Sequence, residues 1–369
     1  MDEQKEAAAN NVITFGCTDC GADLKYEPGT TSLTCEYCGA KNDIPAVDDD
    51  IEELDYEAFL NKETATADEM TINLVKCHVC AAESSLEPHV TSANCPYCDS
   101  SLVVEDAHEE SVLKPKSLLP FKLKKDEAIA QFRKWIKKLW FAPNDLKKAV
   151  LSFDHFKGLY IPYWTYDSAT HTNYTGQRGT YYYVTESYTT TENGKTVRKT
   201  RQVRKTRWSF TAGSINHFFD DVLVPASNSL PRKQVEALEP WDLKNLEPFT
   251  PQYLSGFITE KYQVNLKAGF DRACNIMQSR IDTLIRQDIG GDEQRILTKK
   301  TQYDDIKFKH LLLPAYVSAY NFKGKLYRFM VNARTGEVQG ERPYSWIKIT
   351  LAILIVLGII AAFYFFAKS

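Results

Sequence analysis

Eight cysteines stand in two quartets that share one spacing. Within each quartet the cysteines are separated by two, fourteen and two residues. Two tight turns that each present two sulfurs, joined by a short hairpin, supply the four thiolates that Zn²⁺ binds in a tetrahedron. The spacing therefore predicts two structural zinc ribbons, over residues 14–45 and 72–104. The predicted ligands are Cys17, Cys20, Cys35 and Cys38 in the first ribbon, and Cys77, Cys80, Cys95 and Cys98 in the second.

Other chemistries also use cysteine pairs. Disulfide frameworks are typical of small secreted domains, whereas this chain has 369 residues and begins with the polar segment MDEQKEAAAN. Redox Cys-x-x-Cys motifs belong to βαβ units, which are not predicted here. Iron accepts the same four thiolates and stays an alternative to zinc. Because four thiolates leave no open coordination position, we expect each metal to be structural and to fold a ribbon too small to fold alone.

The turns that carry the cysteines differ between the quartets. Gly21 and Gly39 follow the second cysteine of each pair in the first quartet, and glycine tolerates the positive φ that such a turn needs. The second quartet has Ala81 and Asp99 at these positions, which departs from the glycine pattern.

The chain ends in a segment that can cross a membrane. From Ile349 to Ala367 there are nineteen uncharged residues. As a helix they would extend about 28 Å, close to the hydrocarbon thickness of a bilayer. A buried core helix usually has an amphipathic stripe, but this segment is apolar all round. Tyr344, Trp346 and Tyr364 lie near its ends, as interfacial aromatic residues do.

We therefore predict one transmembrane helix over residues 346–367. Ribbons with reduced cysteines belong in a reducing compartment. The expected location is the cell (inner) membrane, with a single span and the N-terminal bulk in the cytoplasm.

The net charge of −3 hides a division along the chain. Residues 1–117 have 7 basic and 25 acidic side chains, whereas residues 118–345 have 36 basic and 23 acidic ones. Nucleic-acid affinity depends on Lys and Arg that neutralise phosphates. The ribbon at 14–45 has two basic residues against five acids, and the ribbon at 72–104 has one against three. Nucleic acid is therefore not an expected ligand of the ribbons, and protein partners are.

Residues 46–71 form a predicted acidic linker between the ribbons. In AVDDDIEELDYEAFLNKETATADEM, ten acids stand against one lysine. One interpretation is a solvated connector that keeps the ribbons apart. In the other, Ile51, Leu54 and Ala58 form the apolar stripe of a short helix that docks on a basic partner.

Residues 118–345 are predicted to form a basic, β-rich α+β body. KDEAIAQFRKWIKKLWFAP reads as a helix with Asp126 as its N-cap and Pro143 as its stop. This helix belongs either to the core or to an anionic membrane surface. A second helix is expected from Leu266 to a stop at Gly290-Gly291, with Cys274 beside its apolar face as a small hydrophobe. The last part of the body reads as a strand meander, with turns at residues 323–325 and 334–336.

The middle of the body contains the strongest hairpin signal. Alternating Tyr, Thr and Val residues surround Asn193-Gly194, and the second arm from Lys195 to Arg207 has seven basic residues and no acid. Three interpretations stay open: an edge strand protected by charge, contact with anionic lipid headgroups, or contact with an acidic protein. KGLYIPYWTY (157–166) and KHLLLPAYVSAY (309–320) also share a pattern that is typical of a duplicated β unit.

No catalytic motif is found in the sequence. It has no P-loop, no G-x-G-x-x-G after a strand, no H-E-x-x-H and no G-x-S-x-G, and its seven histidines are scattered. We expect a protein that is not an enzyme. An active site formed by residues distant in sequence is the alternative.

With the two ribbons, LYIPYW, FKHLLLPAY, VNARTGEVQGERP and the terminal span in this order, the chain resembles a group of bacterial membrane proteins. These double zinc-ribbon proteins are often labelled as replication-restart-helicase-like, although this chain has no nucleotide-binding motif. Some of them are associated with membrane-stress loci. The resemblance implies a role in bringing phage-shock-type or band-7-type proteins to the membrane.

Together these observations predict a multidomain α+β protein with two zinc ribbons, a β-rich body and one transmembrane helix. The predicted function is that of a non-enzymatic, tail-anchored adaptor that recruits or scaffolds proteins at the inner face of the membrane. A membrane-tethered nucleic-acid-binding protein that uses the basic hairpin arm is the alternative.

Overall fold

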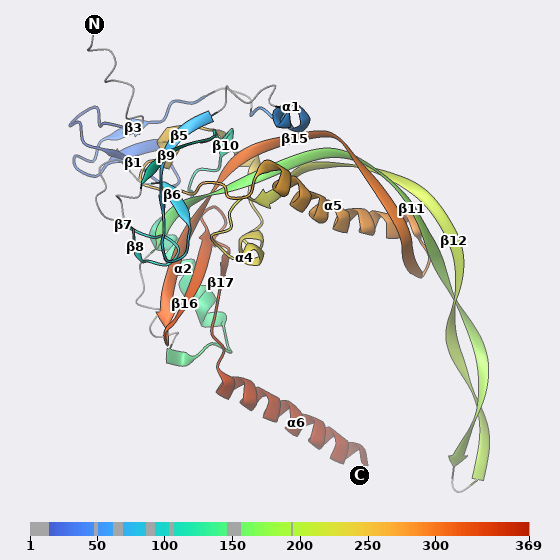
Figure 1. The fold of residues 1–369 in the computed structure, drawn as a ribbon. Coiled ribbons are helices and arrows are strands. Elements are labelled where there is room, and N and C mark those ends of the chain that lie inside the picture. The colour runs from blue at the N-terminus through green and yellow to red at the C-terminus, as the bar shows by residue number, and fades with distance from the viewer. Residues whose placement is uncertain are drawn as a thin grey trace.

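The computed structural model describes residues 15–47, 51–61, 69–85, 93–102, 107–145, 156–192 and 195–368. Its centre is a sheet built on three long strands, β11 (Lys157–Glu192), β12 (Lys195–Pro225) and β15 (Glu293–Phe322). Figure 1 shows these strands curving into an arch that leaves the body and continues as a two-stranded arm. The fold class predicted from the sequence, with two cysteine clusters, a β-rich body and one apolar C-terminal helix, is confirmed.

Shorter elements complete the fold. The main sheet also contains β4 (Leu54–Asp55), β10 (Ser117–Leu118), β13 (Glu247–Pro248), β14 (Ile258–Thr259), β16 (Lys325–Asn332) and β17 (Val338–Gly340). The small sheets are formed by β1 (Leu24–Tyr26), β2 (Ser32–Cys35) and β3 (Lys41–Asp43), by β5 (Glu69–Lys76), β6 (Glu83–Ser85) and β9 (His108–Leu113), and by β7 (Ala93–Asn94) and β8 (Ser101–Leu102). The helices are α1 (Tyr56–Leu60), α2 (Lys125–Lys138), α4 (Arg232–Glu236), α5 (Leu266–Ile289) and α6 (Trp346–Lys368), with 3₁₀ turns η2 (Leu243–Asn245) and η3 (Pro251–Leu254).

The two ribbons cover opposite faces of the main sheet. Successive side chains of a strand point to opposite faces. Tyr160 and Leu312 are buried in one cluster with the β1–β3 sheet and α2. Leu159, Ile161 and Leu313 are buried in another cluster with the second cysteine quartet. Each ribbon therefore packs on the body, which differs from the expectation of two modules held apart by a polar linker.

The two segments that share a sequence pattern lie side by side. They belong to β11 and β15, which pair antiparallel with Ile161 opposite Leu313. Pro162 pairs with Leu312, and Pro314 pairs with Tyr160, so the two prolines are related by a local two-fold axis through the central pair. Prolines lack the N–H that a central strand donates. In both places the proline carbonyl accepts a hydrogen bond from an alanine N–H, Ala226 (2.9 Å) and Ala333 (3.0 Å) respectively.

The long helices match their sequence signals with two corrections, both in α2, which ends at Lys138 and not at Pro143 and begins differently from the prediction. α5 ends where Gly290 adopts a φ of 65°, as predicted. α2 starts at Lys125, and the Glu127 carboxylate accepts the N–H of Lys124 at 2.8 Å. The N-cap position is therefore occupied by Lys124, and Asp126 lies in the first turn of the helix. An acidic side chain in the first turn still favours the helix electrostatically.

Part of the acidic linker belongs to the folded body. β4 pairs with β15, and Leu54, Tyr56 and Phe59 pack into the cluster that also buries α5. The apolar contacts thus come from these side chains and not from a stripe of Ile51, Leu54 and Ala58. The predicted Asn193-Gly194 turn lies outside the described residues, but Glu192 pairs with Lys195, as a hairpin at this position requires.

β-bulges beside Asp167 interrupt the strand register where the sheet leaves the body. The register shifts here in the pairing of β11 with β12 and also in its pairing with β15. Asp221 on β12 and Asp305 on β15 have φ of 49° and 50°. Bulges of this kind bend strands and increase their twist. The Asp167 carboxylate is buried and accepts the Asp221 N–H at 2.6 Å. Lys309 lies nearby and pairs with Asp221 at 2.8 Å and with Glu53 at 3.0 Å.

Asp167→Asn is expected to make stability less dependent on pH. Burial, reinforced by the Glu53 carboxylate, raises the pKa of Asp167 to about 6. The unfolded carboxyl ionises first, so wild-type stability should fall by up to about 3 kcal/mol as pH rises from about 4 to 6. The variant keeps the acceptor for Asp221 and should be more stable than wild type at pH 7.5 but not at pH 4. Urea unfolding at both pH values measures this, and an equal effect at both would contradict it.

Candidate metal centres and basic arm

The first cysteine quartet forms a compact group of four sulfurs. The Cys17 and Cys38 Sγ atoms lie 3.6 Å apart, as do those of Cys20 and Cys35. All four Sγ atoms lie within 4.8 Å of one another. Four thiolates at the usual Zn–S length define a tetrahedron with edges of about 3.8 Å. The residues therefore fit one metal ion without rearrangement of the backbone.

The second quartet repeats this arrangement. Cys77 and Cys98 Sγ lie 3.6 Å apart and Cys80 and Cys95 Sγ lie 3.5 Å apart, with all four within 4.8 Å. The Ser100 hydroxyl lies 3.2 Å from Cys77 Sγ and 3.0 Å from Cys98 Sγ. All nine cysteines of the chain are described and are free thiols. The two predicted groups can thus hold two metal ions.

The same backbone turn presents every cysteine pair. The residue after the second cysteine donates its N–H to the first cysteine's carbonyl, at 2.8–3.0 Å in all four pairs. Its φ is 74° at Gly21 and 76° at Gly39, and 59° at both Ala81 and Asp99. The second ribbon therefore adopts the left-handed conformation without glycine. Holding Ala81 there costs roughly 1–2 kcal/mol, which packing of the ribbon against the body offsets.

Backbone hydrogen bonds favour the thiolate form of Cys35 in the first centre. Hydrogen bonding from the Cys38 N–H lowers the pKa of the Cys35 thiol to about 7. Cys17 and Cys35 are buried against the sheet, whereas Cys20 and Cys38 face solvent. A metal here would join the buried side of the ribbon to its exposed turns. That arrangement is structural, because four protein ligands leave no open position for a substrate.

Polar contacts as well as apolar ones hold the ribbons on the body. In the first ribbon, the Tyr26 hydroxyl donates to the Phe121 carbonyl at 3.2 Å, and the Tyr26 N–H donates to the Ser255 carbonyl at 3.1 Å. In the second, Tyr97 lies between two cysteine ligands and is fully buried, and Arg328 donates to its carbonyl at 3.1 Å. Either ribbon would lose these contacts if its turns came apart.

Sequence patterns did not indicate Glu260, which lies beneath the second centre. Its side chain is buried, and one carboxyl oxygen accepts the Ser227 hydroxyl at 2.7 Å. Burial raises the pKa of Glu260 to about 7. Its neighbour Ser84 on the second ribbon forms an isolated bridge with it. No local pattern around Glu260 predicts this contact, because it depends on the ribbon docking onto the body.

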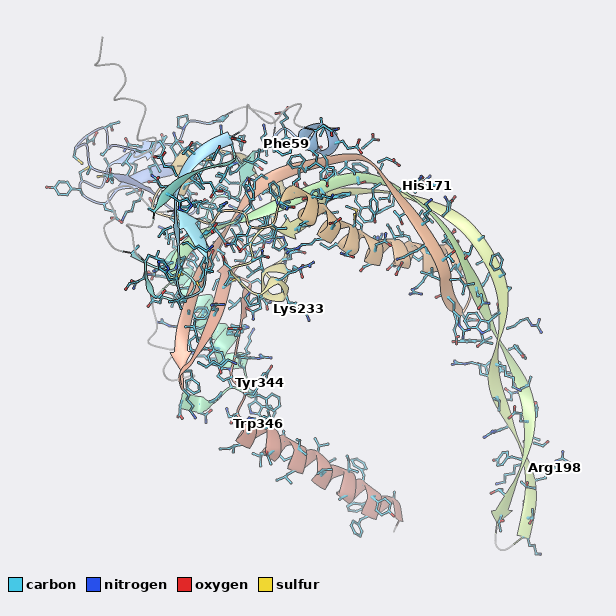
Figure 2. All side chains as sticks on the ribbon, in the orientation of Figure 1. Phe59, His171, Arg198, Lys233, Tyr344 and Trp346 are labelled. Carbon is cyan, nitrogen blue, oxygen red and sulfur yellow. The ribbon has the colours of Figure 1, made fainter. Side chains whose placement is uncertain are left out.

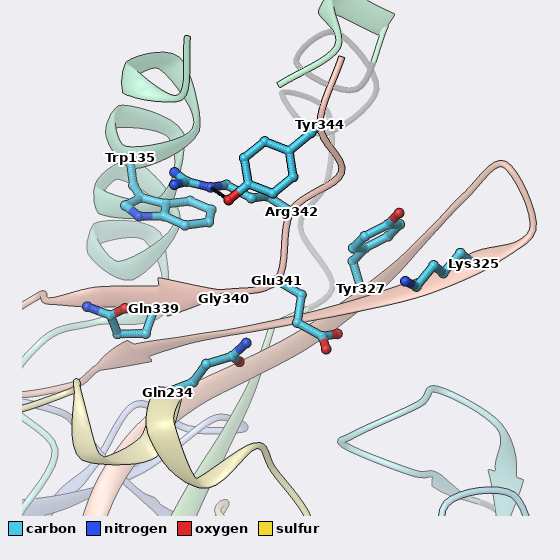
Figure 3. A pocket seen from close by; sticks show the side chains of 9 residues that line it. All are labelled: Trp135, Gln234, Lys325, Tyr327, Gln339, Gly340, Glu341, Arg342 and Tyr344. Atoms are coloured by element: carbon cyan, nitrogen blue, oxygen red, sulfur yellow. Dashed lines mark hydrogen bonds between the residues drawn. The ribbon is translucent and has the colours of Figure 1, made fainter. Parts of the chain in front are cut away.

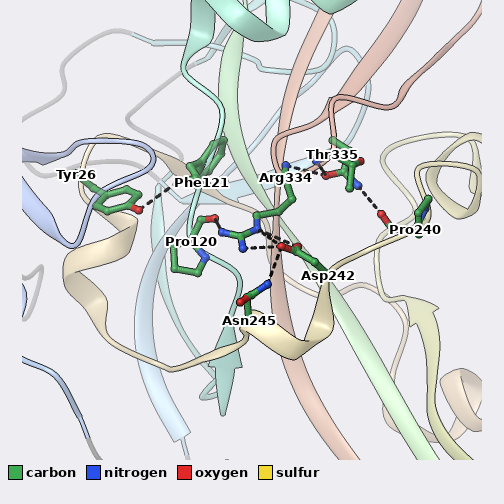
Figure 4. A network of polar contacts seen from close by, with 9 residues as sticks. Tyr26, Pro120, Phe121, Pro240, Asp242, Asn245, Arg334 and Thr335 are labelled. Carbon is green, nitrogen blue, oxygen red and sulfur yellow. Dashed lines mark hydrogen bonds and ion pairs between the residues drawn. The ribbon is translucent and has the colours of Figure 1, made fainter.

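The motif VNARTGEVQGERP contains the turn between β16 and β17, and its side chains bind two segments distant in the sequence (Figure 4). The Arg334 guanidinium pairs with Asp242 through contacts of 2.6–3.1 Å and donates to the Pro120 carbonyl at 3.0 Å. Buried Asn332 donates to the Leu238 carbonyl at 2.9 Å and accepts the Arg334 N–H at 2.8 Å. The motif therefore ties three distant segments together and has a structural role.

The arm is the part of the hairpin beyond the third strand. β15 pairs with β11 only as far as Gly179, so residues 180–192 pair solely with 195–207 among the described residues. Thirteen residue pairs continue without a register shift. At about 3.3 Å per residue the arm extends roughly 43 Å. Figure 2 labels Arg198 near its far end, well away from the body.

The register divides the arm into two unequal faces. Cross-strand partners lie on the same face of the hairpin, and successive residues of each strand point to opposite faces. One face, here called the basic face, has five of the seven cations and both acidic residues of the arm, Glu186 and, by register, Glu192. The opposite face has Arg198 and Arg204, because successive side chains of a strand point to opposite faces. The cations of the basic face are Lys195, Lys199, Arg201, Lys205 and Arg207.

Aromatic side chains lie among these cations. On the basic face, Arg201 lies over the Tyr188 ring at 5.6 Å and Arg207 lies over the Tyr182 ring at 5.3 Å. On the opposite face, Arg204 lies 4.2 Å from the centre of the Tyr181 ring. Cation–π contacts of this kind hold long side chains in place without neutralising them.

α6 meets the requirements for a membrane span. Residues Trp346–Ala367 form a helix that is long and apolar enough to cross a bilayer, and the body buries none of its apolar stretch. Figure 1 shows it leaving the body as a separate rod.

The chain was compared with known families, curated proteins and solved structures. No family model and no solved structure matches it. It is similar to "Uncharacterized protein YdjG" of Bacillus subtilis (strain 168), with 27% identity over 339 residues that cover 90% of this chain and 91% of that protein. At this coverage the similarity extends well beyond the cysteine quartets into the body. The cysteine clusters and the apolar helix fit a membrane-anchored protein with two metal-binding ribbons.

Proposed function

We propose that this protein is a non-enzymatic adaptor that recruits an acidic protein to a membrane through the basic face of its arm. In this proposal both ribbons bind zinc and brace the sheet, α6 anchors the chain in the cell membrane, and the bulk lies in the cytoplasm. The cysteine-only ligand sets support zinc, and zinc-bound thiolates in turn favour a reducing compartment. Proteins of the phage-shock and band-7 types are the candidate partners that the sequence resemblance suggests.

The asymmetry of the arm carries the proposal. An edge strand needs only scattered charge to avoid aggregation, and the two faces would then be similar. Instead five cations gather on one face with the two acids of the arm, Glu186 and Glu192, so this face has more cations and a larger net positive charge than the other. Glu186 pairs with Lys205 at 3.1 Å and with Arg201 at 3.6 Å. Such a surface favours association with an acidic partner and excludes basic ones. Its length also lets it meet a partner at a distance from the body.

A pair of variants matched in charge tests this function. Lys199→Ser/Arg201→Ser removes two cations from the basic face, and Arg198→Ser/Arg204→Ser removes two from the opposite face. Each double variant also removes one cation–π contact. The first should weaken binding of purified candidate partners to the full-length protein by about tenfold or more, at roughly 1 kcal/mol or somewhat less per surface charge pair. The second should leave it within about threefold.

Thermal unfolding of both variants provides the folding control. If both variants weakened partner binding equally, net charge alone would explain the effect. If neither weakened it, the arm would not be the binding surface.

A second function follows from the same arm. Tyrosines interleaved with Arg and Lys also suit single-stranded nucleic acid, which stacks on aromatic rings while cations contact its phosphates. Tight nucleic-acid binding by the wild-type protein that falls steeply with salt, and that Lys199→Ser/Arg201→Ser abolishes, would favour this alternative.

A further inference from the structure

The first turn of α6 is fixed to the body. Lys348 donates to the Trp140 and Ala142 carbonyls at 3.1 and 2.8 Å and to Asn144 Oδ1 at 2.8 Å. The Ser345 N–H donates to the Phe141 carbonyl at 2.7 Å. The Trp140 side chain is 68% exposed beside this turn, as expected of an aromatic anchor at a membrane surface. The edge of the body that holds the start of α6 therefore faces the lipid headgroups when α6 spans a bilayer.

A cavity of about 480 Å³ opens at this edge (Figure 3). It is lined by Tyr344 and Arg342, which precede α6, and by Lys325 and Tyr327 at the start of β16. A chain extends at most about 3.6 Å per residue, so the lining residue Tyr344 lies within roughly 7 Å of Trp346. The polar layer on each side of a bilayer is about 5–8 Å thick. The cavity thus opens within reach of the headgroup layer.

The polar groups in this cavity are of two kinds. Lys325 and Arg342 are exposed cations, each close to an aromatic ring, Tyr327 at 5.6 Å and Tyr344 at 5.5 Å respectively. On the other side, α4 contributes Gln234, whose buried Oε1 has no hydrogen-bond partner among the described residues. An unpaired buried acceptor is costly unless a ligand or water donates to it.

Glu341 adds a negative charge to the acceptor side. Glu341 and Gln234 both line the cavity, and Figure 3 shows the Glu341 carboxylate on the side of the strand where Gln234 lies. One of its oxygens accepts the Arg328 N–H at 3.2 Å, which leaves the other available. Figure 3 shows the Arg342 guanidinium beside Trp135 and Tyr344, and the Lys325 ammonium at the other end of the cavity beside Tyr327. The end of the cavity at Lys325 therefore offers one cation for an anion, and Glu341 and Gln234 offer a carboxylate and an amide oxygen for a cation that donates N–H groups.

We propose that this cavity binds the headgroup of an aminophospholipid, with the phosphate at Lys325 and the primary ammonium at Glu341 and Gln234. The acidic glycerol headgroup has only neutral hydroxyls to donate, which bind these acceptors more weakly than an ammonium does. A choline headgroup has no N–H to donate. The site depends on α6 lying in a membrane but is independent of the arm.

Lipid binding to the full-length protein in detergent tests the site. Native mass spectrometry would follow titration with phosphatidylethanolamine, phosphatidylglycerol and phosphatidylcholine of identical acyl chains. The ethanolamine lipid should bind about tenfold or more tightly than either of the others, since two charge-assisted contacts on the amine are lost in each. Equal binding of the three lipids would overturn the proposal.

Variants assign the contacts. Lys325→Gln should weaken binding of the ethanolamine lipid by about tenfold or more, whereas Lys323→Gln removes a neighbouring exposed cation outside the cavity and should not. Gln234→Leu should reduce the preference for ethanolamine over choline while the variant melts at the wild-type temperature. Unchanged binding in the first variant would refute the site. Free phosphoethanolamine that competes as well as the lipid would show that the ligand is a soluble phosphoester, which also overturns the lipid assignment.

Discussion

Cys35→Ser is expected to release one of the two metal ions and to unfold one face of the body. Cys35 is a buried ligand in the cluster that contains Tyr26, Phe121 and Tyr160. Structural zinc in small domains contributes roughly 10–16 kcal/mol of apparent binding free energy. Loss of the ion should therefore lower the free energy of unfolding by more than about 5 kcal/mol, although the body retains part of the packing.

Native mass spectrometry should count two ions in wild type and one in Cys35→Ser. Hydrogen exchange should rise in β1–β3 and α2, which share a cluster with Cys35, while α5 in a separate cluster stays protected. Cys274→Ser is the matched control, because this half-buried cysteine belongs to neither quartet. It should keep both ions and change stability by no more than about 1 kcal/mol. Loss of both ions in Cys35→Ser would contradict separate centres.

The same packing changes the expectation for isolated ribbons. The sequence has a polar linker between them, which suggests that a fragment ending at residue 117 could hold both ions. In the structure, Tyr26 and Leu33 are buried against body residues such as Tyr253, and Tyr97 is buried in a cluster with Leu119. A fragment without the body would expose these side chains. Metal binding by the fragment should therefore be weaker than in the full chain.

Local sequence signals predicted the local structures. Cysteine spacing determined which sulfurs meet, because each turn is closed by hydrogen bonds within a few residues. The 3.6-residue period and Gly290 indicated α5 and its end, and the alternation of Arg198, Arg201, Arg204 and Arg207 indicated their faces. These features depend only on nearby residues.

Contacts between distant segments were not predictable in this way. Which face each ribbon covers depends on the docking of segments distant in the sequence, such as those of Tyr97, Leu159 and Leu311, which share one cluster. The bulges around Asp167 depend on three strands meeting in one register. The cavity near α6 combines α4, β16 and the segment before the span. The periodic patterns in a sequence predict local elements, and they do not indicate which distant elements pack together.

Arg334→Ala is expected to destabilise the body by about 3–5 kcal/mol, because it leaves the partly buried Asp242 carboxylate without its cation. The Arg334 side chain is only 11% exposed, and its contacts reach both Asp242 and Pro120. Arg232→Ala is the matched control. Its partner Glu236 lies four residues away on α4, and both side chains are largely exposed, so its loss should cost less than about 1 kcal/mol.

The effect of Arg334→Ala should depend on pH in a defined direction. Burial alone would raise the pKa of Asp242, but hydrogen bonds and charge from Arg334 outweigh it and hold the pKa below its usual value. The pair thus stabilises the fold above the unfolded pKa of about 4, and this contribution is lost as pH falls through the lower folded pKa. Urea unfolding in detergent should show a wide gap between wild type and variant at pH 7 and a narrower one at pH 3. The double variant Arg334→Met/Asp242→Asn should recover much of the loss at pH 7, because it removes the unpaired charge and keeps the side-chain volumes. A double variant as unstable as Arg334→Ala would instead assign the effect to the lost contact with the Pro120 carbonyl.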